Sequence, residues 1–201
     1  MSLVVSPSKV FRVAEVILEG GIAFAPTDTI YGLLANALDR RAVERLFAIR
    51  RPSGRPFLLL IPQEDWIEEL GLIIGPRQRK LLSLGITLVI PKRTSVPLYL
   101  TRGRKSLAVR LPSSTAGFIR DLLKVVGVPL VAPSANPEGL KPATSVKEGM
   151  AYFGRRVNIY VDAGKIVGKP STIVRLIGYR SVRLVREGNV PFREVLRFLS
   201  S

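Results

Sequence analysis

The chain contains neither cysteine nor histidine among its 201 residues. The absence of cysteine excludes disulfide bonds, thiolate nucleophiles and cysteine-ligated metal sites. The absence of histidine excludes a Ser-His-Asp triad, histidine-ligated zinc and an imidazole general base. Any catalysis by this chain therefore has to use cations, hydroxyls, amides, carboxylates, backbone groups or a bound hard metal such as Mg²⁺.

Long apolar segments and familiar phosphate-binding motifs are also missing. No run of about 18 apolar residues is present, and residues 1–7 lack the apolar region of a signal peptide, so a cytoplasmic protein without a membrane partner is expected. Neither G-x-x-x-x-G-K-[ST] nor G-x-G-x-x-G occurs. We therefore expect no P-loop and no dinucleotide-binding fold, and we expect no zinc, haem or flavin cofactor.

Acidic residues are scarce relative to basic ones. The chain has 31 Lys and Arg residues against 15 Asp and Glu residues, a formal net charge of +16. A surface with this charge concentrates anions such as nucleotides, pyrophosphate and RNA, although the charge does not choose among them. The many arginines suit bidentate phosphate contacts, and they are also compatible with heat tolerance.

Helical and strand patterns alternate along the chain and predict a single α/β domain with a mixed sheet. The length suits one domain, and 47% hydrophobic residues predict a substantial core. The first helix is expected to start at Ser6 and Pro7 and to stop at Gly20, followed by a strand over residues 22–24. Further helices are expected near residues 40–49, 64–70, 76–84, 118–126, 145–153 and 191–199, and further strands near 57–61, 86–90, 106–111, 130–133, 159–161, 172–176 and 182–186.

The segment APTDTIYG, residues 25–32, places polar side chains directly after the first predicted strand. Because ligands bind beyond the carboxyl ends of strands in open α/β sheets, Thr27, Asp28, Thr29 and Tyr31 are predicted to line a pocket. The alternative is a turn in which Asp28 and the threonines bond their own backbone. The segment by itself does not decide between these two interpretations.

Several other loops carry groups that bind anions. Arg50, Arg51 and Arg55 surround the segment 52–54, and Arg110 ends a predicted strand. Hydroxyl and amide side chains follow two further strands or loops, at Ser134, Asn136, Ser171 and Thr172. These groups predict a site for an anionic ligand.

Seven short motifs in a fixed order make the prediction specific: APTDTIYG, RRPSGRPF, SLAVRLP, APSAN, KPAT, PSTIV and LVREG. Together they resemble the YrdC/Sua5 family of threonylcarbamoyl-AMP synthases, in its short single-domain form. The resemblance implies a YrdC-like twisted mixed β-sheet with helices that forms an open, positively charged concave site. It implies one domain over residues 1–201, with the motifs inside about residues 6–190.

The resemblance implies an enzyme, a nucleotidyltransferase that joins L-threonine, bicarbonate or CO2, and ATP. The products are threonylcarbamoyl-AMP and pyrophosphate, and the adenylate passes to the machinery that makes t6A at tRNA position 37. Mg²⁺ would arrive with ATP, so no protein side chain is assigned to the metal. Oriented cations can align these anions and stabilise the phosphorus centre without histidine or cysteine.

Individual residues are matched to the family motifs one by one. Thr29, Arg110 and Ser171 match threonine-binding positions, and Arg50 and Arg51 lie in the segment matching the catalytic basic motif. The positions that the resemblance assigns to nucleotide binding are Arg51, Arg55, Ser106, Ser134, Asn136, Thr144 and Arg186. For the hydroxyl and amide residues the alternative is a turn or a cap, and for the arginines it is a solvated surface position.

Two other functions are compatible with the sequence. The charge of +16 suits a protein that binds tRNA or double-stranded RNA without synthase activity. A related carbamoyl-transfer enzyme is the second alternative, although its domain normally belongs to a much longer chain. Leu60 also departs from the family, because many members have a histidine at that position.

Overall fold

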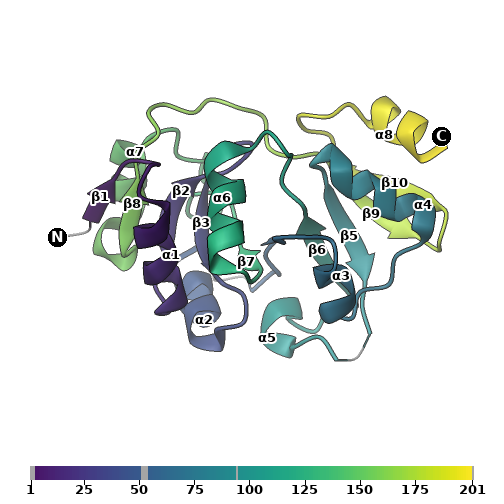
Figure 1. Ribbon diagram of the computed structural model, residues 1–201, viewed down its shortest axis with the longest axis horizontal. Coiled ribbons are helices and arrows are strands. Elements are labelled where there is room, and N and C mark those ends of the chain that lie inside the picture. Colours follow the sequence, from purple (N-terminus) through teal and green to yellow (C-terminus); the bar gives the residue numbers. More distant parts are fainter. Residues whose placement is uncertain (1–2, 51–53, 94, 201) are drawn as a thin grey trace.

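Ten strands form one mixed sheet in the computed structural model, which describes residues 3–50, 54–93 and 95–200 (Figure 1). The strand order is β1-β8-β2-β3-β7-β4-β6-β5-β9-β10, with parallel and antiparallel neighbours. The strands are β1 (Leu3–Val5), β2 (Ala23–Pro26), β3 (Tyr31–Asn36), β4 (Leu59–Leu60), β5 (Thr87–Pro91), β6 (Ser106–Arg110), β7 (Leu130–Val131), β8 (Ile159–Val161), β9 (Ile173–Ile177) and β10 (Ser181–Arg186).

Helices cover both faces of this sheet. α1 and α6 pack against each other on the face turned toward the viewer in Figure 1. The α-helices are α1 (Val10–Leu18), α2 (Arg40–Arg50), α3 (Trp66–Glu69), α4 (Pro76–Arg79), α5 (Leu98–Thr101), α6 (Gly117–Val126), α7 (Val146–Phe153) and α8 (Phe192–Ser200), and 3-10 helices span Lys80–Leu84 (η1) and Gly154–Arg156 (η2). No helix in the described ranges is long and apolar enough to cross a membrane.

Side chains on the two faces of β2 and β3 belong to two separate apolar clusters. Ala23, Ala25 and Leu34 join the cluster under α1 and α6, whereas Phe24 and Leu33 join the larger cluster on the other face. This follows from the alternation of side chains along a strand. All five side chains are buried, which is why both strands are apolar at these positions.

The predicted end of α1 and start of α7 are confirmed, whereas the predicted start of α1 at Ser6 and Pro7 is wrong. Ser6 and Pro7 lie in a turn closed by a 3.1 Å hydrogen bond from the Lys9 amide to the Ser6 carbonyl oxygen, and the helix begins at Val10. Gly20 follows α1 with a φ of +82°, a backbone conformation that glycine adopts without strain. Ser145 caps α7 by accepting a hydrogen bond from the Glu148 amide at 3.3 Å. The Glu148 carboxylate accepts from the Thr144 amide at 2.8 Å, one residue further back than in a standard capping box.

Four elements were not predicted: β1, β3, α5 and the short 3-10 helix η2. The sequence of β3, YGLLAN, contains Gly32 and Asn36, which are uncommon in strands. Gly32 fits there closely, because a Cβ atom would lie 3.3 Å from the Pro133 carbonyl oxygen and 3.1 Å from the Thr27 methyl carbon, so its neighbours would have to shift slightly. Tertiary packing therefore overrides local strand propensity in β3.

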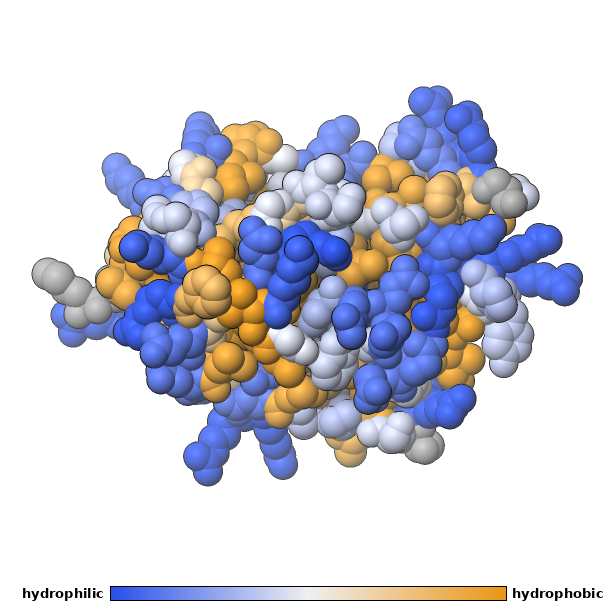
Figure 2. Space-filling model, in the orientation of Figure 1, coloured by the Kyte–Doolittle hydropathy of each residue, from blue (hydrophilic) through white to orange (hydrophobic). Residues whose placement is uncertain are grey.

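Hydrophilic side chains project over much of the face seen in Figure 2, with apolar patches between them. Some large apolar side chains of the described residues are exposed, and Phe11 of α1 is 77% exposed. Single exposed apolar side chains are common on folded proteins and need no ligand to explain them.

We expect Gly149→Ala to destabilise the fold by about 1–3 kcal/mol through overpacking. A Cβ atom on Gly149 would lie 2.4 Å from the Phe24 ring, which cannot withdraw because it stacks on Tyr31 with ring centroids 4.6 Å apart. Urea unfolding measures the effect. Gly117→Ala is the matched control in α6, where nothing lies within 4 Å, and it should leave stability unchanged or raise it. Equal stability of the two variants would contradict this packing.

Candidate active site

A cavity of about 250 Å³ lies where the β2–β3 loop meets the ends of several neighbouring strands. Its size is below the ~300–1,000 Å³ typical of sites for drug-sized ligands, so it suits a small molecule or part of a larger one. Its walls combine apolar side chains with hydroxyls and two guanidinium groups. The described lining residues are Thr27, Thr29, Ile30, Tyr31, Gly32, Pro56, Phe57, Leu58, Thr87, Ala108, Arg110, Ala132, Pro133, Ser134, Pro142, Pro170, Ser171, Ile173 and Arg186.

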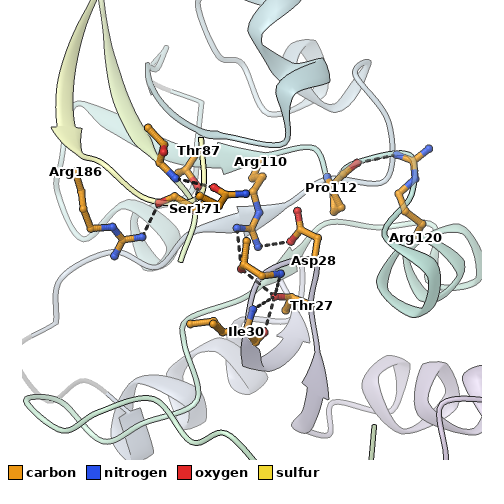
Figure 3. Close-up of polar contacts among 12 residues, drawn as sticks. Thr27, Asp28, Ile30, Thr87, Arg110, Pro112, Arg120, Ser171 and Arg186 are labelled. Atoms are coloured by element: carbon orange, nitrogen blue, oxygen red, sulfur yellow. Dashed lines mark hydrogen bonds and ion pairs between the residues drawn. The ribbon is translucent and has the colours of Figure 1, made fainter. Parts of the chain in front are cut away.

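The loop that joins β2 and β3 is held by Thr27. The Thr27 hydroxyl donates to the Ile30 carbonyl oxygen at 2.6 Å and accepts from the Thr29 amide at 3.3 Å and the Ile30 amide at 3.4 Å (Figure 3). Thr27 therefore plays the turn-forming part that the sequence left open. Thr29 lines the cavity, and its hydroxyl lies 3.4 Å from Arg110 Nη1.

Arg110, the last residue of β6, brings a charge into the cavity wall and is itself only 3% exposed. Its Nη2 atom lies 2.8 Å from Asp28 Oδ1, and both side chains are almost completely buried. The pKa of Arg110 is lowered because burial disfavours the cation, an effect that the Asp28 carboxylate opposes and the neighbouring Arg186 cation reinforces. An arginine stays protonated through such a shift, so the cavity wall carries a permanent positive charge.

A second guanidinium group reaches the cavity from β10. Arg186 Nη2 donates to the Ser171 carbonyl oxygen at 2.9 Å, and burial lowers the Arg186 pKa. The Ser171 hydroxyl lies 2.8 Å from the Thr87 hydroxyl of β5, and both are buried (Figure 3). A pair of hydroxyls can either donate to or accept from a ligand, because either proton can point away from the pair.

Thr172 fixes the segment that follows Arg186. The Thr172 hydroxyl donates to the Val190 carbonyl oxygen and accepts from the Gly188 amide at 2.9 Å and the Val190 amide at 3.2 Å. Gly188 permits this close approach, since a Cβ atom there would lie 2.0 Å from the Pro170 carbonyl oxygen. These hydrogen bonds hold the segment after β10, the strand that ends at Arg186, against the start of β9, which follows Ser171 and Thr172.

On the other side of the cavity, Arg50 and the APSAN loop form one hydrogen-bond network. The Arg50 side chain is buried, at 5% exposed, and its Nε atom donates to the Ser134 carbonyl oxygen at 2.9 Å. Its Nη2 atom donates to Ser134 Oγ at 3.2 Å and to Asn136 Oδ1 at 3.3 Å. Ser134 Oγ donates to Asn136 Oδ1 at 2.7 Å. Asn136 Nδ2 donates to the Pro137 and Leu140 carbonyl oxygens. The structure thus brings the three predicted residues together and places Ser134 in the wall.

Arg50 and Asn136 are not among the described lining residues, and three further residues predicted on the nucleotide side are also absent from the lining. Arg55 pairs with Glu138 at 3.0 Å on the surface, and Ser106 Oγ accepts from Arg175 at 3.2 Å. Thr144 contacts the Glu148 carboxylate at the start of α7. Arg51 lies outside the described residues.

One residue of the site, Thr87, carried no clear signal in the sequence. Thr87 lines the cavity from the start of β5, an apolar strand in which a single threonine is not distinctive. Asp28 was expected to line the pocket, but it is not among the described lining residues and instead pairs with Arg110. Leu60 is buried in the apolar cluster under α1 and α6.

The acidic residues of the described chain do not form a metal centre. No group of three or more carboxylates with the arrangement of a metal site occurs among the described residues. The described lining residues of the cavity also include no carboxylate. A Mg²⁺ ion at this site would therefore fit best as a companion of ligand phosphates, because hard cations prefer oxygen ligands of that kind.

These features define an α/β protein with an open mixed sheet and a cationic cavity at the strand ends. A family model for Sua5, YciO and YrdC proteins, described as telomere recombination, matches residues 15–188. The chain belongs to this family, as its motifs predicted.

Individual relatives agree with this assignment. Threonylcarbamoyl-AMP synthase from Pyrococcus abyssi is 34% identical over 194 residues, which cover 93% of this chain and 56% of the relative. The synthase from Halorhodospira halophila is 31% identical over 169 residues, which cover 81% of this chain and 86% of the relative. The chain thus spans little more than half the length of the P. abyssi relative.

Solved structures confirm the predicted fold class. The structure of P. abyssi Sua5 complexed with L-threonine has a TM-score of 0.86 and 31% identity, covering 98% of this chain and 60% of that chain. Escherichia coli YciO has a TM-score of 0.82 over 96% of this chain and 98% of its own. At 23% identity, YciO supports the fold alone.

We expect Thr172→Val to lower the free energy of unfolding by about 2 kcal/mol, because it removes a hydroxyl that serves two amides and a carbonyl. Thr172→Ser keeps the hydroxyl and is the matched control. Urea denaturation of both variants measures the difference. A Val variant as stable as the Ser variant would show that these hydrogen bonds do not hold the Arg186 segment.

Proposed function

We propose that this chain is an L-threonylcarbamoyladenylate synthase. The observation that carries the proposal is the buried Arg110 guanidinium beside the hydroxyls of Thr29 and Ser171, in a member of this family. Arginine suits carboxylate recognition, because its planar donors can bind both oxygens. The names of the relatives and the threonine complex of P. abyssi Sua5 support the same assignment.

In this proposal the amino acid binds on the side of the cavity formed by Thr29, Arg110 and Ser171. Arg110 would receive the threonine carboxylate, and the hydroxyl groups would bind its polar atoms. The small apolar wall, which includes Ala108 and Ile173, would receive the methyl group. A small cavity with a few directed polar groups is typical of such recognition.

The nucleotide would bind on the side formed by Arg50, Ser134 and Asn136, with Arg186 between the two ligands. Arg51, Arg55, Ser106 and Thr144 are further nucleotide contacts in this proposal. The Arg50 network fixes the APSAN loop before any ligand arrives, which reduces the ordering cost of binding.

The proposed reaction has two steps. The threonine amine first gives a carbamate, either with CO2 and loss of a proton or with bicarbonate and loss of water. A carbamate oxygen then attacks the α-phosphorus of ATP, the bond to the β-phosphate oxygen breaks, and pyrophosphate leaves. The protein aligns two anions and offsets their repulsion with Arg50, Arg110 and Arg186, which is the main task in phosphoryl-group chemistry. Mg²⁺ bound to ATP would add to this neutralisation, and the adenylate would pass to the tRNA t6A machinery.

The purified chain should release pyrophosphate only when ATP, Mg²⁺, L-threonine and bicarbonate are all present. With ¹³C-bicarbonate, mass spectrometry should detect labelled threonylcarbamoyl-AMP. Pyrophosphate release without threonine, or no adenylate under any condition, would contradict the proposal. Carbamoyl phosphate in place of threonine and bicarbonate tests the carbamoyl-transfer alternative in the same assay.

Arg110→Lys should raise the KM for threonine by about 10–100-fold, because a single ammonium group cannot reproduce the paired donors of a guanidinium. The KM for ATP should change much less. Arg120→Lys is the matched control, since Arg120 contacts the Pro112 carbonyl oxygen away from the cavity (Figure 3). A rise in the ATP KM alone would place Arg110 on the nucleotide side instead.

A structured RNA remains a second candidate ligand on the basis of the net charge of +16. Binding to duplex RNA should weaken steeply with salt, with a log-log slope of about −0.7 to −0.9 per phosphate contact. Weak binding at moderate salt would argue against this function.

A further inference from the structure

A carboxylate of the protein already occupies one side of the proposed carboxylate-binding arginine. Asp28 Oδ1 lies 2.8 Å from Arg110 Nη2, and the exposed fractions of the two side chains are 6% and 4%. The substrate carboxylate of the proposed reaction would need the same guanidinium. The protein therefore holds an internal anion against the same guanidinium group that an external anion in the cavity has to bind.

The charges around the cavity show what this internal anion does. Among the described lining residues, Arg110 and Arg186 are cationic and none is acidic. With Asp28 included, the immediate net charge is about +1, and without it the charge would be about +2. Because the Arg110 and Asp28 side chains are largely removed from water, a change of one charge at this distance alters anion affinity strongly.

The hydrogen bonds show that Asp28 does not saturate Arg110. Within the described part of the chain, Arg110 Nε and Asp28 Oδ1 have no hydrogen-bond partner, although the two groups are close enough to form an ion pair. The other arm of the guanidinium makes one long contact, 3.4 Å from Nη1 to Thr29 Oγ1. Asp28 thus balances the charge of Arg110 but leaves part of its hydrogen-bonding capacity unused.

We infer that Asp28 is a resident counter-ion that weakens the binding of anions in this cavity and thereby determines its selectivity. A simple anion such as inorganic phosphate gains mainly from charge, so Asp28 penalises it heavily. A ligand that also contacts Thr29 and Ser171 offsets the penalty with directed hydrogen bonds. Taking threonine as that ligand rests on the proposed function, whereas the effect of Asp28 on simple anions does not.

Asp28→Asn removes the charge and keeps the shape and an acceptor oxygen for Arg110. At constant ionic strength, we expect the Kd of inorganic phosphate to fall about tenfold, measured from the rise in melting temperature with phosphate concentration. The KM for threonine should also fall in the Asp28→Asn variant. L-Threoninamide lacks the carboxylate and is cationic. As an inhibitor, it should bind the Asp28→Asn variant no more tightly than it binds the unsubstituted chain.

Asp28→Glu is the control that keeps the charge, and its phosphate affinity should stay near that of the unsubstituted chain. If Asp28→Asn does not fold, Asp28→Ser tests the same loss of charge. Unchanged or weaker phosphate binding in the neutral variant would overturn the inference. Tighter binding of threoninamide by the neutral variant would overturn it as well. That result would point to a change in the shape of the cavity, because a loss of negative charge cannot by itself favour a cationic ligand. If the unsubstituted chain makes no adenylate, the proposed function fails, while the phosphate titration still decides the role of Asp28.

Discussion

The burial of the Arg110 charge is the constraint on which the rest of the site depends. Placing a guanidinium group out of water is costly, and breaking such a pair by removing one partner typically costs about 3–5 kcal/mol. Arg110 is kept there by Asp28, which comes from a different part of the sheet. The β2–β3 loop and the end of β6 must therefore stay together for the fold to tolerate this charge, and their meeting point is the cavity.

The order of the strands explains how segments far apart in the sequence reach one place. β7 and β4 lie between β3 and β6, and β5 separates β6 from β9. This order brings the PTDT loop, the strand-end arginine and the PSTIV segment around a common space, as Figure 3 shows for Thr27, Arg110 and Ser171. The site is therefore a property of the sheet topology and cannot be assembled by any single loop.

The sequence predicted most helices and many strands, because apolar periodicity and capping residues such as Ser145 act locally. It missed β3, whose Gly32 is selected by contacts with Pro133 and Thr27 that no local pattern contains. The ordered motifs predicted that Thr29, Arg110 and Ser171 share a site. They could not show that Thr27, which lines the cavity together with Thr29, also holds the turn, because that role depends on hydrogen bonds within the folded loop.

The same limit applies to Ser134 and Asn136. Their spacing predicted side chains that face the same way, but Asn136 uses its amide to hold the Pro137 and Leu140 carbonyls and accepts from Ser134 and Arg50. Asn136 is therefore suited to shaping the loop, whereas Ser134 lies in the wall. In a chain without histidine or cysteine, such fixed networks matter more than any single reactive group. Chemistry that depends on aligning anions requires donors and cations held in place before the ligands arrive.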